Sequence, residues 1–175
     1  MRARSWTRVF VAFACALGAV ACGNPAQDNL INSLGPEASG VRRGPLHRPG
    51  QPCLACHSAA GGRHPQFSVA GTVYQTSDST KPARDVIVEL TDSKGRKYSV
   101  ASNCAGNFYV QERDFQPVYP MTVKLEYGSL ETKMFTNIYR EGSCAGCHYD
   151  PPGYNRAEHV YVDVAGQTQF PGGCQ

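Results

Sequence analysis

Hydrophobic and polar residues alternate with a period of two over most of the chain from Phe67 onward. Successive side chains of a β-strand point to opposite faces, so this alternation predicts strands with one buried face. Turns rich in Gly, Asn, Asp and Ser separate the runs. Seven strands are expected, near residues 67–73, 86–90, 98–100, 108–110, 121–127, 130–134 and 160–164. Seven short strands without a convincing helix predict a mainly β fold, a seven-stranded antiparallel β-sandwich.

The chain before these strands has a different character. Residues 1–21 have three arginines within the first eight positions. An apolar stretch follows at 9–20, which is too short to span a bilayer comfortably. This arrangement is typical of an export signal. Residues 22–52 are rich in Gly, Pro, Asn and Ser and lack periodicity, so we expect a tether or linker there. Further along, we expect a first cysteine-bearing loop at 53–66 and a β-sandwich domain at 67–175 with a second such loop at 144–158.

The end of the export signal, Ala19-Val20-Ala21-Cys22, resembles the lipobox of bacterial lipoproteins, in which the cysteine receives lipid. A leucine is usual where Ala19 stands, and the same small residues suit ordinary signal cleavage, which would give a soluble exported protein. The resemblance implies lipidation of Cys22. Gly23, where an aspartate would signal inner-membrane retention, implies the outer membrane. We therefore expect an exported, lipid-anchored protein in the periplasm or at the outer membrane, with the cell surface as a further option.

The formal charge of +3 belongs to the export signal rather than to the domain. Cleavage after residue 21 takes away three of the 17 basic residues, which leaves as many basic residues as the 14 acidic ones. Nucleic-acid binding would need a clustered basic face, and the sequence offers only a small group of arginines at 42, 43 and 48. Nucleic acid is therefore not an expected partner.

One strand-and-turn segment resembles a known family. The run Ser102-Asn103-Cys104-Ala105-Gly106-Asn107-Phe108-Tyr109 is similar to the Thr-Asn-x-x-Gly-x-Phe/Tyr signature of carboxypeptidase regulatory-like domains. Residues 71–74 and 86–92 fit the opening strands of that family, so the similarity covers about residues 67–136. Cys104 departs from the pattern, which has a small residue without a thiol there. The resemblance implies a transthyretin-like or Ig-like sandwich.

Two copies of Cys-x-x-Cys-His carry the most specific chemical signal. They are Cys53-Leu54-Ala55-Cys56-His57 and Cys144-Ala145-Gly146-Cys147-His148. The motif is the attachment site of c-type haem. Two thiols three residues apart reach the two vinyl groups of the porphyrin, and the adjacent histidine binds the iron. We expect two c-type haems, held by the four cysteines, with His57 and His148 as proximal ligands. At these two motifs the chain resembles multihaem c-type cytochromes.

The sequence leaves three other uses of the paired cysteines open. Cys53, Cys56, Cys144 and Cys147 could form a zinc site, but this would leave the histidine after each pair unexplained. A redox Cys-x-x-Cys would need a thioredoxin-like βαβ context, which the strand pattern lacks. Two local disulfides are the third alternative, because an exported protein meets an oxidising compartment.

The remaining cysteines can be placed by their context. The chain has 8 cysteines. Cys15 leaves with the export signal, Cys22 is the expected lipid site and four belong to the motifs. Cys104 and Cys174 remain, and in an exported protein we expect them to form a disulfide. This disulfide would tie the C-terminal tail to the turn before Phe108, and two free thiols are the alternative.

The second axial ligand of each haem is less defined. Three histidines remain as candidate metal ligands, namely His47, His64 and His159. His47 and His64 lie in loops that could fold over a haem. His159 alternates with the valines of the last strand, which would turn it away from the sandwich core. Met121 and Met134 lie in strand patterns and are expected in the core.

The order of the elements predicts where the two motifs lie. The first motif precedes the first strand, and the second motif precedes the last strand. If these two strands pair in parallel, both haems lie at the same end of the sandwich. The haems would then be near enough for rapid electron exchange.

These expectations converge on an electron-transfer dihaem cytochrome c of the bacterial cell envelope, a carrier rather than an enzyme. Its partners would be other redox proteins or extracellular electron acceptors, with the membrane reached through the lipid anchor. Haem propionates would make the mature protein negative, which favours a basic partner surface. One alternative is a haem enzyme that reduces peroxide, nitrite or nitric oxide, with Arg63 and His64 in its distal pocket. Another is a structural module of a multihaem conduit.

Overall fold

The computed structural model describes residues 24–37, 39, 41, 43–148 and 157–174. The predicted export signal and its lipidation site at Cys22 lie outside the described residues. In chain order the elements are α2 (Pro25–Ser33), α3 (Cys53–Cys56), β1 (Phe67–Thr72), β2 (Ile87–Thr91), β3 (Lys97–Ala101), β4 (Asn107–Gln111), β5 (Thr122–Tyr127), β6 (Leu130–Lys133) and the 3-10 helix η2 (Cys144–Gly146). Within these ranges, no helix has the length and apolar character needed to cross a membrane.

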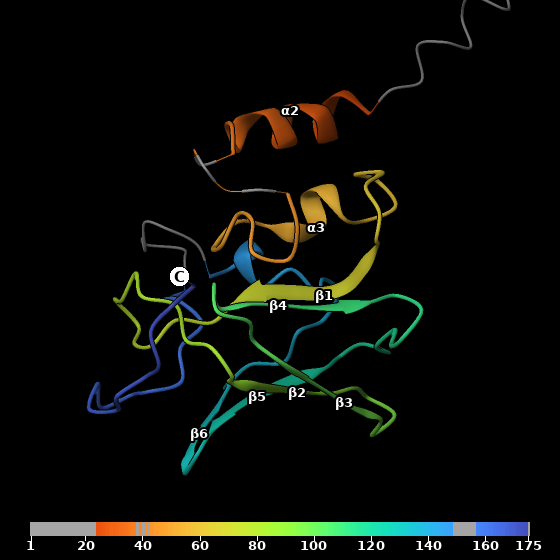
Figure 1. Cartoon of the computed structure of the whole chain (residues 1–175). Helices are drawn as coiled ribbons and strands as arrows, with labels where there is room; N and C mark the ends of the chain where they lie inside the picture. Colours follow the sequence, from red (N-terminus) through yellow and green to blue (C-terminus); the bar gives the residue numbers. More distant parts are fainter. Residues whose placement is uncertain (1–23, 38, 40, 42, 149–156, 175) are drawn as a thin grey trace, which may run out of the picture.

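The strands form two antiparallel sheets that pack as two layers (Figure 1). β1 and β4 make a two-stranded sheet, and a four-stranded sheet has the spatial order β3-β2-β5-β6. α3 and η2 both contact β1, and α2 lies beyond α3, on the outside (Figure 1). The prediction of a mainly β fold with two antiparallel sheets is confirmed. The described part of the chain has six regular strands, whereas seven were expected.

The apolar side chains of the alternating pattern fill the space between the two sheets. Val88 and Leu90 of β2 are fully buried. In the register of the larger sheet, Val88 lies opposite Leu125 of β5, and Leu90 lies opposite Val123. The smaller sheet adds Val69, Phe108 and Val110 to the same core. Each such buried side chain stabilises the fold by roughly 1.5–3 kcal/mol.

The expected last strand, 160–164, is not a regular strand. Val162 is buried, but Val164 is 75% exposed, so the valines do not share a buried face. The carboxylate of Asp163 accepts hydrogen bonds from three backbone N–H groups between 165 and 168, at 2.6–3.1 Å. A carboxylate that binds the backbone ahead of it turns the chain, in competition with the hydrogen bonds of a strand.

The turn between β3 and β4 is held by one asparagine side chain. Oδ1 of Asn103 accepts hydrogen bonds from the backbone N–H groups of Ala105 at 2.9 Å and Asn107 at 3.1 Å. The backbone N–H of Asn103 also donates to the carbonyl of Asn107 at 2.9 Å. Asn is favoured at such turns because its short side chain reaches the backbone two residues on. The turn therefore has one defined conformation.

Cys104, within this turn, forms a disulfide with Cys174. Their Cα atoms are 4.9 Å apart, and the two residues are separated by 70 positions in the sequence. The predicted pairing is confirmed. The bond ties the C-terminal tail to the connection that leads into β4.

The turn between β2 and β3 is organised by Asp92, whose carboxylate is only 4% exposed. It accepts hydrogen bonds from the backbone N–H groups of Lys94, Arg96 and Val118, and the guanidinium of Arg96 lies 2.7 Å away. Burial by itself raises the pKa of Asp92, but the hydrogen bonds, from Val118 first and then from Arg96, outweigh burial and lower the pKa to about 2. The folded protein therefore favours the ionised carboxylate.

Removal of the disulfide should destabilise the domain. In a variant with both Cys104→Ser and Cys174→Ser, the unfolded chain gains conformational entropy, because the loop between the two positions is no longer closed. We expect the free energy of unfolding to fall by roughly 2–4 kcal/mol, measured by urea denaturation. The parent protein unfolded in the presence of a reductant should lose a similar amount. Equal stability of parent and variant would contradict a disulfide that persists in the folded protein.

Asp92 should make stability depend on pH in the acid range. Because its pKa is depressed by folding, its contribution is complete above the ~3.9 of an unfolded aspartate and is lost as the pH falls through about 2. We expect Asp92→Asn to unfold several degrees below the parent at pH 7, with the difference narrowing as the pH falls toward 2. Thermal unfolding followed by circular dichroism measures both. Asp114→Asn, at an exposed ion pair, is the control and should change little. A difference independent of pH would contradict the ionised state of Asp92.

Candidate functional site

The first Cys-x-x-Cys-His motif is a single helical turn. α3 spans Cys53–Cys56, and the backbone N–H of His57 donates to the carbonyl of Cys53 at 2.8 Å. Ala55 is buried and fixes the turn against the domain. Residues three apart in a helical turn lie on the same side, so the two thiols project together and His57 follows at the end of the turn.

The second motif is a 3-10 turn that is closed by the same hydrogen bond as the first. η2 spans Cys144–Gly146, and the backbone N–H of His148 donates to the carbonyl of Cys144 at 2.8 Å, as in the first motif. Ala145 is buried and anchors this turn. Two segments far apart in the sequence thus present two cysteines and one histidine in the same way.

The histidine of each motif is oriented by a backbone carbonyl further along the chain. Nδ1 of His57 lies 2.8 Å from the carbonyl oxygen of Pro65. Nδ1 of His148 makes the same kind of bond to the carbonyl oxygen of Glu158. A carbonyl can only accept, so Nδ1 carries the proton in both rings and Nε2 keeps its lone pair. Metal-bound histidines are almost always held in this manner, and both rings are set to offer Nε2 to a metal.

β1 positions both motifs. The backbone N–H of Phe67, at its start, donates to the carbonyl of His57 at 2.7 Å. Near its middle, the N–H of Ala70 donates to the carbonyl of Gly142 at 2.9 Å, and Ala70 makes a parallel bridge with Ser143. α3 and η2 consequently lie close together on the side of β1 away from the larger sheet (Figure 1). One strand therefore fixes the separation of the two motifs.

Two glycines allow η2 and β1 to approach closely. A Cβ on Gly71 would lie 2.7 Å from Cβ of Cys144 and 2.9 Å from its Sγ. A Cβ on Gly142 would lie 2.0 Å from the carbonyl oxygen of Ser68. The absence of these side chains makes room for the first thiol of the second motif.

The four motif cysteines are free thiols, so the alternative of two local disulfides is wrong. Burial raises the pKa of the Cys53 thiol to about 11. Burial, followed by the charges of Cys53 and Cys147, raises the pKa of the Cys144 thiol to about 12. Redox-active Cys-x-x-Cys motifs depend on a lowered thiol pKa, which is the opposite shift.

A tetrahedral zinc site would need the four thiols to converge on one point. In the described segments, no group of three or more His, Cys, Asp or Glu side chains is placed to hold a metal ion. The cysteines therefore stand as two separate pairs, each with its own histidine.

The candidate second ligands differ in their surroundings. The ring of His47 is half-buried, with its centre 5.8 Å from that of His57. His64 is exposed and lines an open hollow of about 550 Å³ together with Gln111 and Arg113.

His159 differs from the other two candidates in its burial, although it is not part of the apolar core. It is only 5% exposed, its ring stacks on Tyr74 at a centre distance of 4.2 Å, and its Nδ1 lies 3.0 Å from the carbonyl oxygen of Ser79. Packing at the end of the sandwich thus encloses a side chain that alternation alone would turn outward. The expected core positions are confirmed, since Met121 is 1% exposed and Met134 packs against the core.

Of the predicted parallel pairing between the first strand and the last segment, the described residues make a single bridge. Tyr74, just beyond β1, makes a single parallel bridge with Tyr161, and its backbone N–H donates to the carbonyl of Val160 at 2.7 Å. The second motif enters earlier, beside Ala70. Both motifs therefore lie along the same strand, although a paired last strand is not what brings them there.

Several residues of the site were not predicted from the sequence. The ring of His57 stacks on Phe67 at 4.6 Å, and Phe67 stacks on Tyr109 at 4.8 Å. Part of the expected tether also belongs to the site, because Thr72 and Asn107 bind its backbone. These two buried polar residues in otherwise apolar strands were the available signal, since buried polar groups require partners.

A side chain at position 71 should disturb the second motif. Gly71→Ala forces Cys144 to move, so we expect the free energy of unfolding to fall by roughly 1–3 kcal/mol. In protein produced without haem, alkylation of the half-buried Cys144 thiol should become faster, because the thiol is pushed outward. Urea denaturation and mass-spectrometric labelling measure these effects. Gly172→Ala, at a position with open space around it, should leave both unchanged, and an unaffected Cys144 in Gly71→Ala would show that the contact is not tight in solution.

Comparison with known proteins gives no relative from which a role could be transferred: no protein-family model, no curated protein and no solved structure matches the chain. The roles of the two motifs must be argued from their own geometry. That geometry consists of two cysteine pairs and two oriented histidines on a common strand.

Proposed function

We propose that this chain is an electron-transfer protein that carries two covalently attached c-type haems at the bacterial cell envelope. The observation that carries the proposal is the shared geometry of the two motifs. In each, the histidine N–H closes the turn on the first cysteine at 2.8 Å, and the histidine Nδ1 is bound by a downstream carbonyl. Two distant segments with the same arrangement favour one common ligand chemistry.

The donor set of each motif fits a c-type haem. Two thiols on one side of a turn and an adjacent imidazole with a free Nε2 are what covalent attachment and axial ligation require. At the second motif, Ser143 is buried, and its Oγ has no hydrogen-bond partner among the described residues. An unpaired buried hydroxyl is costly, which supports a further group beside Cys144.

When bound, each haem iron supplies one-electron chemistry between its ferric and ferrous states. The protein's own residues hold and orient. The cysteines attach the group covalently, so a sandwich filled by its own side chains need not enclose it. The carbonyls of Pro65 and Glu158 fix the rings of His57 and His148 and increase the basicity of Nε2.

The common strand supports exchange of electrons between the two sites. The first motif is hydrogen-bonded to β1 at Phe67, and the segment just before the second motif is hydrogen-bonded to β1 at Ala70. Neighbouring sites on one rigid strand would let an electron that enters at one haem leave at the other. This arrangement suits a carrier that contacts two redox partners.

An exported location agrees with the disulfide. Cys104 and Cys174 are paired, and disulfides persist in oxidising compartments. Anchoring through a lipid on Cys22 would keep the carrier at the membrane. With haem propionates added to a balanced charge, its redox partners, whether proteins or extracellular acceptors, would present basic surfaces.

Covalent haem attachment is the decisive test. Produced in a bacterium with the c-haem attachment machinery, the parent protein should carry the mass of two haems under denaturing conditions. The pair Cys53→Ala and Cys56→Ala should remove one haem, and the pair Cys144→Ala and Cys147→Ala should remove the other. Intact mass and the absorption spectrum of the reduced protein measure both.

The matched control removes the two other cysteines. The pair Cys104→Ser and Cys174→Ser should retain both haems, since these residues belong to the disulfide. A parent protein without covalent haem would contradict the proposal. The two single-haem variants also test proximity, because loss of one haem should shift the midpoint potential of the other when the two are neighbours.

A further inference from the structure

The geometry around His47 points to a second axial ligand for the first motif, an inference that depends on the proposed function. The ring centres of His47 and His57 are 5.8 Å apart, with an angle of 48° between the ring planes. Two imidazoles on opposite sides of one metal ion, each ~2 Å from it, have ring centres roughly 6 Å apart. We infer that the iron at the first motif is bound by His57 on one side and by His47 on the other.

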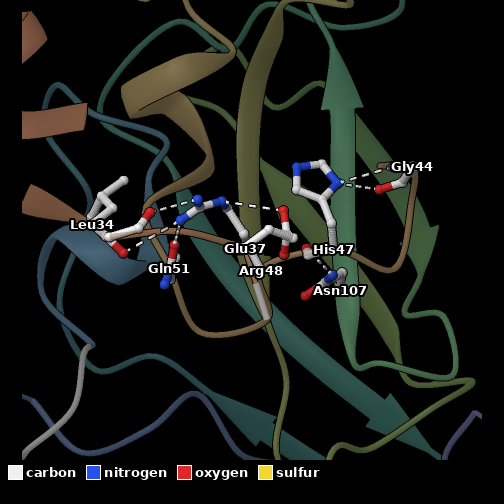
Figure 2. A network of polar contacts seen from close by, with 8 residues as sticks. Leu34, Glu37, Gly44, His47, Arg48, Gln51 and Asn107 are labelled. Carbon is white, nitrogen blue, oxygen red and sulfur yellow. Dashed lines mark hydrogen bonds and ion pairs between the residues drawn. The ribbon is translucent and has the colours of Figure 1, made fainter. Parts of the chain in front are cut away.

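The ring of His47 is oriented in the same way as the two motif histidines. Its Nδ1 lies against the backbone of Gly44, three residues earlier, where it contacts the carbonyl oxygen and also the N–H group, the latter at 3.4 Å (Figure 2). In the tautomer that donates from Nδ1 to this carbonyl, Nε2 keeps its lone pair. In that tautomer His47 offers the same donor atom as His57 and His148, from a loop with no cysteine of its own.

The loop that carries His47 is held to the sandwich by buried polar residues. Nδ2 of Asn107, in β4, donates to the carbonyl of His47 at 3.1 Å, and the two are drawn together in Figure 2. Nδ2 of Asn103 donates to the carbonyl of Pro45 at 2.8 Å. The backbone N–H of Gly50 donates to Oγ1 of Thr72 at 2.7 Å. Both ends of the loop are thus fixed by residues whose positions the sheet determines.

Arg48, next to His47, fixes the loop from the other side. Its guanidinium lies 3.3 Å from the carboxylate of Glu37 and donates to Oε1 of Gln51 and the carbonyl of Gly35, both at 2.7 Å (Figure 2). A side chain with this many partners has little freedom. A ligand must be held in place to bind metal well, and these contacts hold the backbone of His47.

The other candidate ligands are less suited to the first motif. His64 is exposed on the segment that supplies the Pro65 carbonyl to His57. His159 is enclosed against Tyr74 and 5% exposed, and Met121 is a core residue with 1% exposure. His47 combines partial exposure with a ring that lies beside His57.

Ligation by two histidines has a functional consequence. A haem with both axial positions filled by histidine has a low potential and leaves no position for a small oxidant. The first motif would then serve electron transfer and would not bind peroxide, nitrite or nitric oxide.

The test replaces His47 and leaves both attachment motifs intact. Haem-loaded His47→Ala should keep the mass of two covalent haems but convert one of them from low-spin to high-spin, seen by absorption and electron paramagnetic resonance. That haem should also bind carbon monoxide, whereas the parent protein should bind none at the first motif. His64→Ala, at an exposed position three residues before the start of β1, is the control and should remain like the parent.

A second variant separates ligation from folding. His47→Met replaces imidazole by a thioether, so it should remain six-coordinate while the midpoint potential of one haem rises. If His47→Ala retains two haems that both stay low-spin and His47→Met has unchanged potentials, the assignment of His47 is wrong although the proposed function stands. If the parent protein carries no covalent haem, the proposed function itself fails.

Discussion

Backbone hydrogen bonding along β1 is the constraint on which the site depends. β1 pairs with β4 through one of its edges, and its remaining N–H groups at Phe67 and Ala70 bind the carbonyls of His57 and Gly142. An edge strand with unpaired groups invites pairing with other segments, and here the two cysteine motifs supply that pairing. The motifs are therefore part of the sheet's hydrogen-bond system. Their separation is as well defined as the strand itself.

The side chains of the site follow a second rule, in which backbone carbonyls orient imidazole rings. His57, His148 and His47 each have Nδ1 bound to a main-chain oxygen. The three carbonyls come from loops rather than from strands, so the loops perform a chemical task that their composition does not reveal. This explains how a domain with few buried charges can hold three imidazole rings through main-chain contacts. It also explains why side-chain geometry here is determined largely by the path of the main chain.

The sequence was sufficient for the features that local chemistry determines. Alternation located β1 to β6 because their inward residues, such as Val88 and Leu90, must be buried. The pairing of Cys104 with Cys174 was expected because disulfides form in exported proteins. Sequence-based prediction failed where long-range contacts override local pattern. The valines at 160–164 alternate like a strand, yet Asp163 turns the chain. The Gly-rich stretch before Cys53 looks like a tether, yet Asn107 and Thr72, far along the sequence, bind it in place.

The disulfide also supports the loop that carries His47. Cys104 lies between Asn103 and Asn107, the two residues whose amides hold the loop of His47. The covalent link to Cys174 therefore acts as a mechanical brace at the base of that loop. Local opening of a segment costs less free energy when fewer contacts restrain it. Reduction of the disulfide would loosen the support of His47 before it unfolds the sandwich, so the integrity of the site depends on this bond.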